Sequence, residues 1–248
     1  MITDPWFYAV AIPAVILVGL SKGGFAGISS LSLPLLALQI SPLRGAAIML
    51  PILMVQDVVS VWAYWRKWDW ANLKVLFPGA VVGILAGYFL AAYVSDAVFK
   101  LALGVISLLF GARYLLPSGP QVPKPVHLQA GLFWGAMSGF TSMIANAGAP
   151  PFQIYVMPQR LPRDVFIGTS LIFFAIVNWV KVPPFIALGL FTRETLLTSF
   201  VLFPLAIAAT WAGVLLVRRV PADAFYRIIY GLMILVGAKL IWDGMAGL

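Results

Sequence analysis

Long apolar runs, separated by short polar segments, dominate the chain. A helix needs roughly 20 residues to cross about 30 Å of hydrocarbon. Five runs fit that length: Ala46–Tyr64, Lys74–Val94, Ala97–Leu116, Thr195–Val217 and Phe225–Trp242. A sixth, shorter run covers Val165–Val180 and extends toward Leu190 through Pro183-Pro184. The pattern predicts an all-helical protein that crosses a membrane several times.

Two further apolar stretches are too long for one crossing. Trp6–Ile40 has 35 residues and Leu128–Pro158 has 31, which correspond to roughly 52 and 46 Å at about 1.5 Å per helical residue. Glycine, serine and proline interrupt them, within Ser21–Pro34 and Ser138–Pro151. Because unpaired backbone groups cannot face lipid, we predict that each stretch is a broken or re-entrant helical segment buried in the bundle.

The two halves of the chain repeat a pattern of glycine, proline and phenylalanine. Residues of the first half recur in order, at offsets that rise from 116 to 126: Gly19 and Gly135, Gly23 and Gly139, Pro34 and Pro150, Pro42 and Pro162, Phe77-Pro78 and Phe203-Pro204, Gly87 and Gly213, Phe99 and Phe225, Gly111 and Gly237. We therefore expect one membrane domain over residues 1–248. It contains repeat one at 6–116, a proline-rich linker at 117–127 and repeat two at 128–243, and each repeat is a broken segment followed by three transmembrane helices.

The distribution of positive charge favours one topology. If each broken stretch enters and leaves on the same side, ten basic residues lie on the side away from the termini: Arg66, Lys67, Lys74, Arg113, Lys124, Arg160, Arg163, Arg218, Arg219 and Arg227. Five lie on the side of the termini: Arg44, Lys100, Lys181, Arg193 and Lys239. Single crossings would instead divide them seven against eight. Only the first arrangement obeys the positive-inside rule, and it predicts inverted repeats with both termini in the periplasm.

Composition supports a membrane protein and excludes several other classes. The chain is 62% hydrophobic and 10% charged, with a mean hydropathy of +1.00, whereas soluble domains are about 45–50% apolar and 25% charged. Cysteine is absent and His127 is the one histidine, so thiol chemistry and a multi-histidine metal centre within this chain are excluded. The sequence has no phosphate-cradling loop. We expect no cofactor, no metal, no nucleic-acid partner and no enzymatic activity.

Several motifs lie in the interrupted stretches and after the second one: Gly19-Leu20-Ser21-Lys22-Gly23-Gly24-Phe25-Ala26-Gly27, Ala147-Gly148-Ala149-Pro150-Pro151-Phe152-Gln153-Ile154-Tyr155, Gly168-Thr169-Ser170, Phe173-Phe174-Ala175-Ile176-Val177-Asn178 and Lys181-Val182-Pro183-Pro184. Together they resemble the TauE/SafE sulfite exporter family, also called the toluene-sulfonate uptake permease (TSUP) family, over nearly the whole chain. The resemblance implies a secondary transporter that moves sulfite, a sulfonate or another small organic anion across a bacterial inner membrane, inward or outward.

Small polar residues of the interrupted stretches are the candidate substrate contacts. Half-helix N-termini aimed at the membrane midplane attract anions, and neutral polar side chains add hydrogen-bond donors. Alternatively, small residues at four-residue spacing only let helices pack closely, as in Gly19, Gly23 and Gly27 or in Gly131, Gly135 and Gly139. The residues expected to contact substrate are Ser21, Lys22, Gly23, Gly24, Ser29, Ser30, Thr141, Ser142, Asn146, Gly148, Gln153, Thr169 and Asn178.

Lys22 and Asp57 are ionisable residues deep in apolar runs, where charge is costly. Lys22 is interpreted as the cation that compensates a bound anion or takes part in coupling, or else as half of a structural ion pair or an ammonium that reaches a wet vestibule. A Lys22–Asp57 pair could exchange protons with a passing anion, or simply neutralise the lysine. Asn178 lies near the corresponding point of repeat two. Lys181 is expected at the membrane edge, as a solvated anchor or as a vestibule cation.

These residues leave three functional hypotheses. Broken segments in inverted repeats are typical of secondary transporters, so alternating access driven by a proton or potential gradient is preferred. A passive anion channel of the same fold is the first alternative. The second is an intramembrane serine hydrolase with Ser138 or Ser142 as nucleophile and Lys22 as its base. The expected partners are the lipid bilayer and a small anion.

Overall fold

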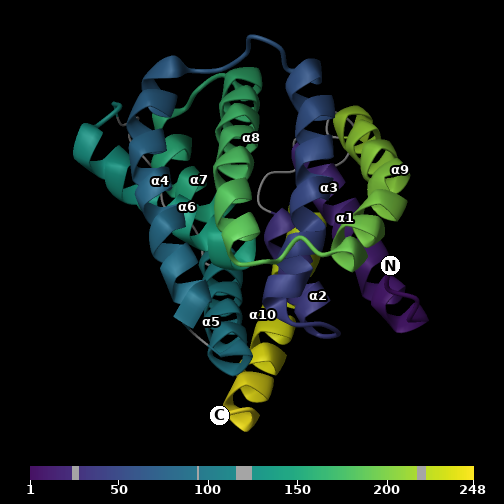
Figure 1. Cartoon of the computed structure of the whole chain (residues 1–248). Coiled ribbons are helices and arrows are strands. Elements are labelled where there is room, and N and C mark those ends of the chain that lie inside the picture. Colours follow the sequence, from purple (N-terminus) through teal and green to yellow (C-terminus); the bar gives the residue numbers. More distant parts are fainter. Residues whose placement is uncertain (24–27, 94, 116–124, 217–221) are drawn as a thin grey trace.

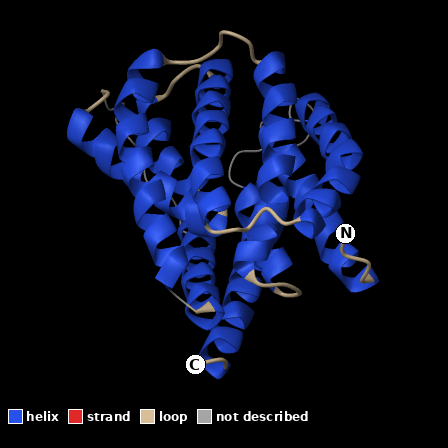
Figure 2. Cartoon of the chain, viewed as in Figure 1, coloured by secondary structure: helices blue, strands red, loops and turns tan. Residues whose placement is uncertain are grey.

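The computed structural model describes residues 1–23, 28–93, 95–115, 125–216 and 222–248. The side chains of 113–115, 222–230 and 232 also lie outside the described set, as do Gly24 and most of the expected linker. Within the described residues every regular element is a helix (Figure 2). The prediction of an all-helical protein is confirmed.

The first half contains an interrupted segment and then three long helices. Its elements are α1 (Pro5–Gly23), the 3-10 helix η1 (Ile28–Leu31), α2 (Ser32–Ala37), α3 (Pro42–Ala63), α4 (Trp70–Tyr93) and α5 (Asp96–Leu115). Residues 24–27, on which part of the predicted interruption falls, lie outside the described residues; before them α1 reaches Gly23, and after them the stretch continues in the short elements η1 and α2 rather than in one long helix. The three long helices match the predicted runs, although α3 and α4 each begin four residues earlier.

The second half repeats this order of elements. It contains α6 (Leu128–Ala145), α7 (Ala149–Val156), the 3-10 helix η2 (Met157–Gln159), α8 (Arg163–Ala187), α9 (Arg193–Leu216) and α10 (Ala222–Ala246). The interruption lies at 146–148, whereas Ser138–Ser142 stays helical within α6. The sixth run is one long helix, α8, which continues through Pro183 and Pro184.

Helices from different halves pack against each other in matching pairs. In the first pairing, α1 lies along α9 and α6 lies along α4. In the second, α3 contacts α9 and α8 contacts α4, while α5 packs along α10 and α3 also contacts α8. Each of these contacts is retained when the halves are exchanged, so that α1, α3, α4 and α5 take the places of α6, α8, α9 and α10.

Glycines set the close approach of these pairs. A Cβ atom at Gly83 of α4 would lie 1.9 Å from the Ala136 carbonyl oxygen of α6, and one at Gly139 of α6 would lie 2.1 Å from that of Ala80. At Gly23 a Cβ would meet the Gly213 backbone of α9 at 2.1 Å. For these glycines the helix-packing interpretation holds.

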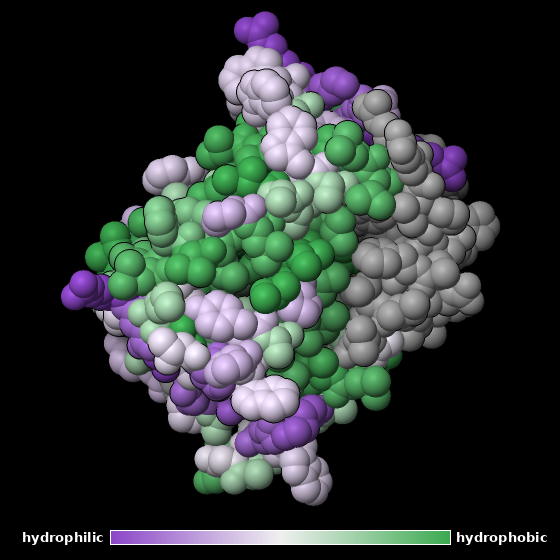
Figure 3. Space-filling model, turned by 90° about the vertical axis from the view of Figure 1, so that its right-hand side faces the viewer, coloured by the Kyte–Doolittle hydropathy of each residue, from purple (hydrophilic) through white to green (hydrophobic). Residues whose placement is uncertain are grey.

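The outer surface of the bundle suits a lipid environment. Five described helices, α1, α3, α4, α8 and α9, are long and apolar enough to cross a membrane. Figure 3 shows a broad hydrophobic band on the face that carries α9, with hydrophilic residues toward the upper and lower ends. Exposed apolar side chains on α9 include Leu196, Leu197, Phe200, Val201, Ile207 and Leu215. The chain is a multi-pass membrane protein.

Equivalent connections of the two halves lie at opposite ends of the bundle. In Figure 1 the connection from α3 to α4 is at the top, and the connection from α8 to α9 is toward the bottom. The N-terminus belongs to the lower end, since the Ile2 N–H donates to Thr198 Oγ1 at the start of α9 (3.0 Å). The C-terminus lies at the same end (Figure 1).

Candidate functional site: a cationic cavity between the interrupted segments

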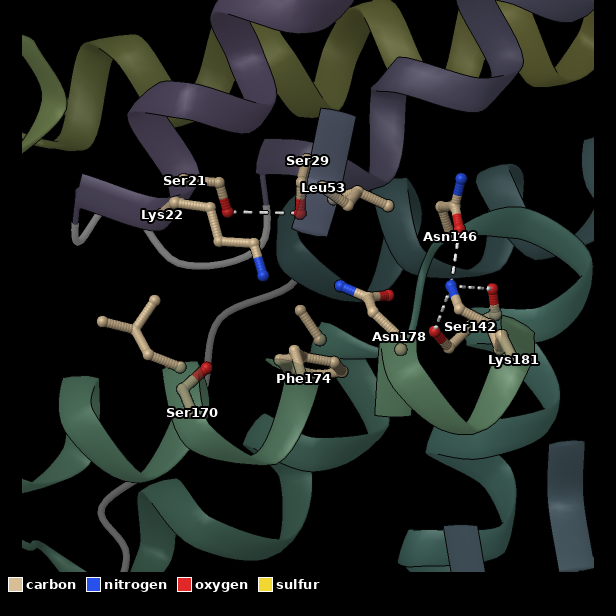
Figure 4. A pocket seen from close by; sticks show the side chains of 13 residues that line it. Ser21, Lys22, Ser29, Leu53, Ser142, Asn146, Ser170, Phe174, Asn178 and Lys181 are labelled. Carbon is tan, nitrogen blue, oxygen red and sulfur yellow. Dashed lines mark hydrogen bonds between the residues drawn. The ribbon is translucent and has the colours of Figure 1, made fainter. Parts of the chain in front are cut away.

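A small cavity lies where both interruptions meet α8. Its volume is about 50 Å³, room for a few water-sized atoms. The lining residues come from both halves (Figure 4): Ser21, Lys22, Ser29, Leu53, Ser142, Asn146, Gly148, Ala149, Ser170, Leu171, Phe174, Asn178 and Lys181. Residues with hydroxyl, amide and ammonium groups therefore line the same cavity.

The first interruption brings Ser21 and Lys22 to the cavity. Both stand in the last turn of α1, and Lys22 is only 7% exposed. The Ser21 hydroxyl donates to Ser29 Oγ across the interruption (3.1 Å). The hydroxyl of Tyr64 donates to the Gly23 carbonyl oxygen (3.2 Å), which accounts for one carbonyl that has no partner within the helix.

The second interruption is built around Asn146. This residue caps the C-terminus of α6 in the left-handed conformation (φ 49°), and its N–H donates to the Ser142 carbonyl oxygen (3.2 Å). Asparagine tolerates this conformation better than most residues. The Ser138 hydroxyl donates to the Gly148 carbonyl oxygen (2.7 Å), and a side chain at Gly148 would collide with Phe174 and Ser138. These contacts hold the start of α7 against α6.

Lys22 forms an ion pair with Asp57 of α3. The second carboxylate oxygen of Asp57 accepts a hydrogen bond from the Asn178 side-chain amide of α8 (2.7 Å). Asp57 and Asn178 are 4% and 3% exposed. The Lys22 ammonium also lies 5.9 Å from the centre of the Phe174 ring, within cation–π range. The pair anticipated from the sequence therefore exists, and Asn178 binds its carboxylate directly.

Lys181 is wholly buried, so the expectation of a solvated anchor at the membrane edge is wrong. Its ammonium donates to Asn146 Oδ1 (3.0 Å), Ser142 Oγ (3.3 Å) and the Ser142 carbonyl oxygen (3.4 Å). The reason is that α8 packs against the second interruption, so that the Lys181 ammonium is enclosed by Ser142 and Asn146. Of the two roles considered, that of a solvated anchor is excluded.

Several expected contacts do not line the cavity. Gly23, Ser30, Thr141, Gln153 and Thr169 are absent from its lining, and Gly24 lies outside the described residues. Thr141 and Thr169 are buried, but their hydroxyls donate to carbonyl oxygens of Met137 and Val165 one turn earlier. Such bonds satisfy a hydroxyl within its own helix.

Several lining residues were not among the expected substrate contacts, and most of them lie on α8, as the expected Asn178 does. Ser170, Phe174, Asn178 and Lys181 follow one another at spacings of four, four and three, so they share one face of the helix. This spacing is visible in the sequence and, starting from Asn178, would have pointed to the other three. Leu53, Ala149 and Leu171 had no comparable signal.

The chemistry of the cavity suits a small anion. Two ammonium groups, amides and hydroxyls line it, and the N-terminus of α7, with its positive helix dipole, begins there at Ala149. Within the described residues no three His, Cys, Asp or Glu side chains lie close enough together to hold a metal ion. Lys22 contacts Asp57 rather than a serine, unlike the base of a serine nucleophile.

His127, the last residue of the expected linker, has a structural role. His127 is exposed and caps α6, because its Nδ1 accepts from the Ala130 N–H (3.4 Å). Its backbone N–H donates to the Tyr155 hydroxyl (3.1 Å). It is far from the cavity lining and contributes nothing to the site.

The sequence matches the family described as Sulfite exporter TauE/SafE over residues 11–240. No curated protein and no solved structure matches the chain. The matched segment contains both interruptions and every cavity-lining residue. The chain thus belongs to the TauE/SafE sulfite exporter family, the TSUP family of membrane transporters.

Proposed function

We propose that the protein is a secondary transporter that carries sulfite, a sulfonate or a related small organic anion across the bacterial inner membrane by alternating access. The observation that carries this proposal is the cavity of about 50 Å³ between the interrupted segments, with Lys22 and Lys181 in its wall. Buried cations in a membrane protein are costly unless they are used or paired. An anion is the kind of ligand that these two ammonium groups would attract.

The size of the cavity favours a compact substrate. A volume of about 50 Å³ holds roughly four water-sized atoms, and sulfite or the head group of a sulfonate has four non-hydrogen atoms. A bulky aryl group would need a wider site. The favoured substrates are therefore sulfite and short-chain sulfonates.

The arrangement of the halves supports alternating access. The main contacts between helices, α1 with α9 and α4 with α6, and α3 with α9 and α4 with α8, are retained when the halves are exchanged, and the connections from α3 to α4 and from α8 to α9 lie at opposite ends in Figure 1. Both features are expected of inverted repeats, in which the same motion can open either side in turn. The positive-inside distribution of charge favours a periplasmic location for both termini.

Two ion pairs stand at equivalent positions near these two ends. Arg44 at the start of α3 pairs with Glu194 at the start of α9. Lys67, in the connection from α3 to α4, pairs with Asp164 at the start of α8 (2.6 Å). The repeat offset of 120 residues places Arg44 on Asp164. Each pair is about half-exposed, and such pairs stabilise by only about 0.2–1 kcal/mol, so either end can open at little cost.

Asp57 is the proposed coupling residue. Its two oxygens are bound by Lys22 and by Asn178. An anion that draws Lys22 toward itself weakens one of these contacts and leaves a carboxylate able to accept a proton. This exchange would link anion movement to a proton gradient, whereas a net movement of charge would link it to the membrane potential.

Counterflow in proteoliposomes tests the proposal. Vesicles loaded with unlabelled methanesulfonate should take up labelled methanesulfonate transiently above its equilibrium level, because a carrier returns faster with substrate bound. A passive channel of the same fold would give uptake that preloading does not stimulate. Absence of uptake for both methanesulfonate and sulfite, with protein present in the vesicles, would contradict the proposed function.

A further inference from the structure

Lys181 has no acidic partner within the described part of the chain. Its ammonium donates to Asn146 Oδ1, Ser142 Oγ and the Ser142 carbonyl oxygen, at 3.0, 3.3 and 3.4 Å, and all three acceptors are neutral. The side chain is fully buried. A buried cation ordinarily needs an opposite charge as well as hydrogen bonds. The cavity next to this ammonium is where such a charge can bind.

An unused hydrogen-bond donor lies beside the same lysine. The Asn146 side chain accepts from Lys181 through Oδ1, while its Nδ2 is buried without a partner among the described atoms. An unpaired buried donor carries a desolvation penalty of about 1–3 kcal/mol, which a ligand with acceptor oxygens would remove. Asn146 also lines the cavity (Figure 4). A charged donor and an unpartnered neutral donor thus belong to two residues of the cavity wall.

Lys22 differs from Lys181 because its charge is already balanced. It pairs with Asp57, and Asn178 occupies the other carboxylate oxygen at 2.7 Å. With all three side chains ionised, the charges of Lys22, Asp57 and Lys181 sum to one positive charge. One negative charge on the ligand would neutralise the site.

We propose that Lys181 is the residue that holds the charge of the transported anion, and that the net charge of the site selects singly charged oxyanions over doubly charged ones of the same size. The inference rests on the proposed function and adds the charge class of its substrate. A doubly charged anion would leave one uncompensated negative charge in a buried cavity, which is strongly unfavourable. Neutralising Asp57 would raise the charge of the site to two positive charges, which a doubly charged anion would balance.

A purely structural role for Lys181 makes different predictions. Its three hydrogen bonds also tie α8 to the interruption between α6 and α7, and loss of this tie alone would impair the protein whatever the charge of the cavity. A substitution at Asp57 changes the net charge of the site but does not rebuild the hydrogen bonds between Lys181 and the interruption. It therefore separates the two roles.

The test compares methanesulfonate and sulfate, which are similar in size but carry one and two negative charges. Wild-type protein in proteoliposomes should exchange methanesulfonate and discriminate against sulfate. Lys181→Met should lower methanesulfonate exchange by at least about tenfold, the effect of 1.4 kcal/mol, and adding Asp57→Asn should recover part of it by freeing the charge of Lys22. Asp57→Asn alone should shift the preference toward sulfate. Lys239→Met, which removes an exposed lysine paired with Asp243, is the matched control and should resemble wild type.

The outcomes distinguish the inference from the proposed function. A wild-type protein that carries neither anion refutes the proposed function. A wild-type protein that carries methanesulfonate while Lys181→Met carries it equally well overturns the inference alone. The inference is also overturned if the Lys181→Met/Asp57→Asn protein is monodisperse but recovers no methanesulfonate exchange. If Lys181→Met fails to fold, the Asp57→Asn variant decides, since an unchanged preference between the two anions contradicts selection by charge.

Discussion

Replacing Lys22 by methionine is expected to abolish anion transport while the protein remains folded. The substitution keeps most of the buried volume but removes the ammonium that pairs with Asp57. The anion then loses an attracting charge and meets a carboxylate that no longer has its cation. Uptake of methanesulfonate into proteoliposomes should therefore fall by at least about a hundredfold, the effect of about 2.8 kcal/mol on binding.

Two further variants control for this result. Lys239→Met removes an exposed lysine of α10 and should leave uptake unchanged. Lys22→Met/Asp57→Asn removes both charges of the pair, so it should regain part of the lost uptake and most of any lost stability. Normal transport by Lys22→Met would remove Lys22 from the site.

The second large effect is expected from Gly83→Ala, which should destabilise the bundle. The new Cβ would lie 1.9 Å from the Ala136 carbonyl oxygen and 2.7 Å from the Phe140 backbone nitrogen. Both are backbone atoms of α6, so α4 and α6 must separate along their shared interface. Overpacking typically costs about 1–3 kcal/mol, and a backbone collision belongs at the upper end. Unfolding of the purified protein in detergent should show this loss.

Gly231→Ala is the matched control for this prediction. Gly231 lies in α10, and no described heavy atom lies within 4 Å of a Cβ built there. Alanine favours helix over glycine by about 1 kcal/mol, so this variant should be as stable as wild type or slightly more stable. Equal stability of Gly83→Ala and wild type would mean that α4 and α6 do not approach as closely as described.

Sequence patterns predicted the interruptions well because their physical cause is local. A stretch of 31 to 35 apolar residues cannot be one crossing, and a helix that stops within the membrane must do so where glycine, proline or asparagine allows it. The left-handed Asn146, which ends α6, follows this rule. The inverted relation of the halves and the domain boundaries stay predictions.

The site was harder to predict because burial depends on the helices around it. Lys181 was expected at the membrane edge, yet its side chain is fully buried against Ser142 and Asn146 of the second broken segment. Thr141 and Thr169 looked like substrate contacts, but their hydroxyls bond within their own helices. Residue type gave the available chemistry, whereas only tertiary packing determines which groups face the cavity.

Thiol protection at Ser170 tests most directly whether an anion occupies the cavity between the interrupted segments. The chain has no cysteine, Ser170 lines the cavity, and Ser170→Cys changes only its hydroxyl to a thiol. Methanesulfonate should slow alkylation of this thiol by N-ethylmaleimide and should not affect Ser95→Cys, an exposed position between α4 and α5. Alkylation of the Ser170→Cys protein at the same rate with and without methanesulfonate would contradict an anion site there.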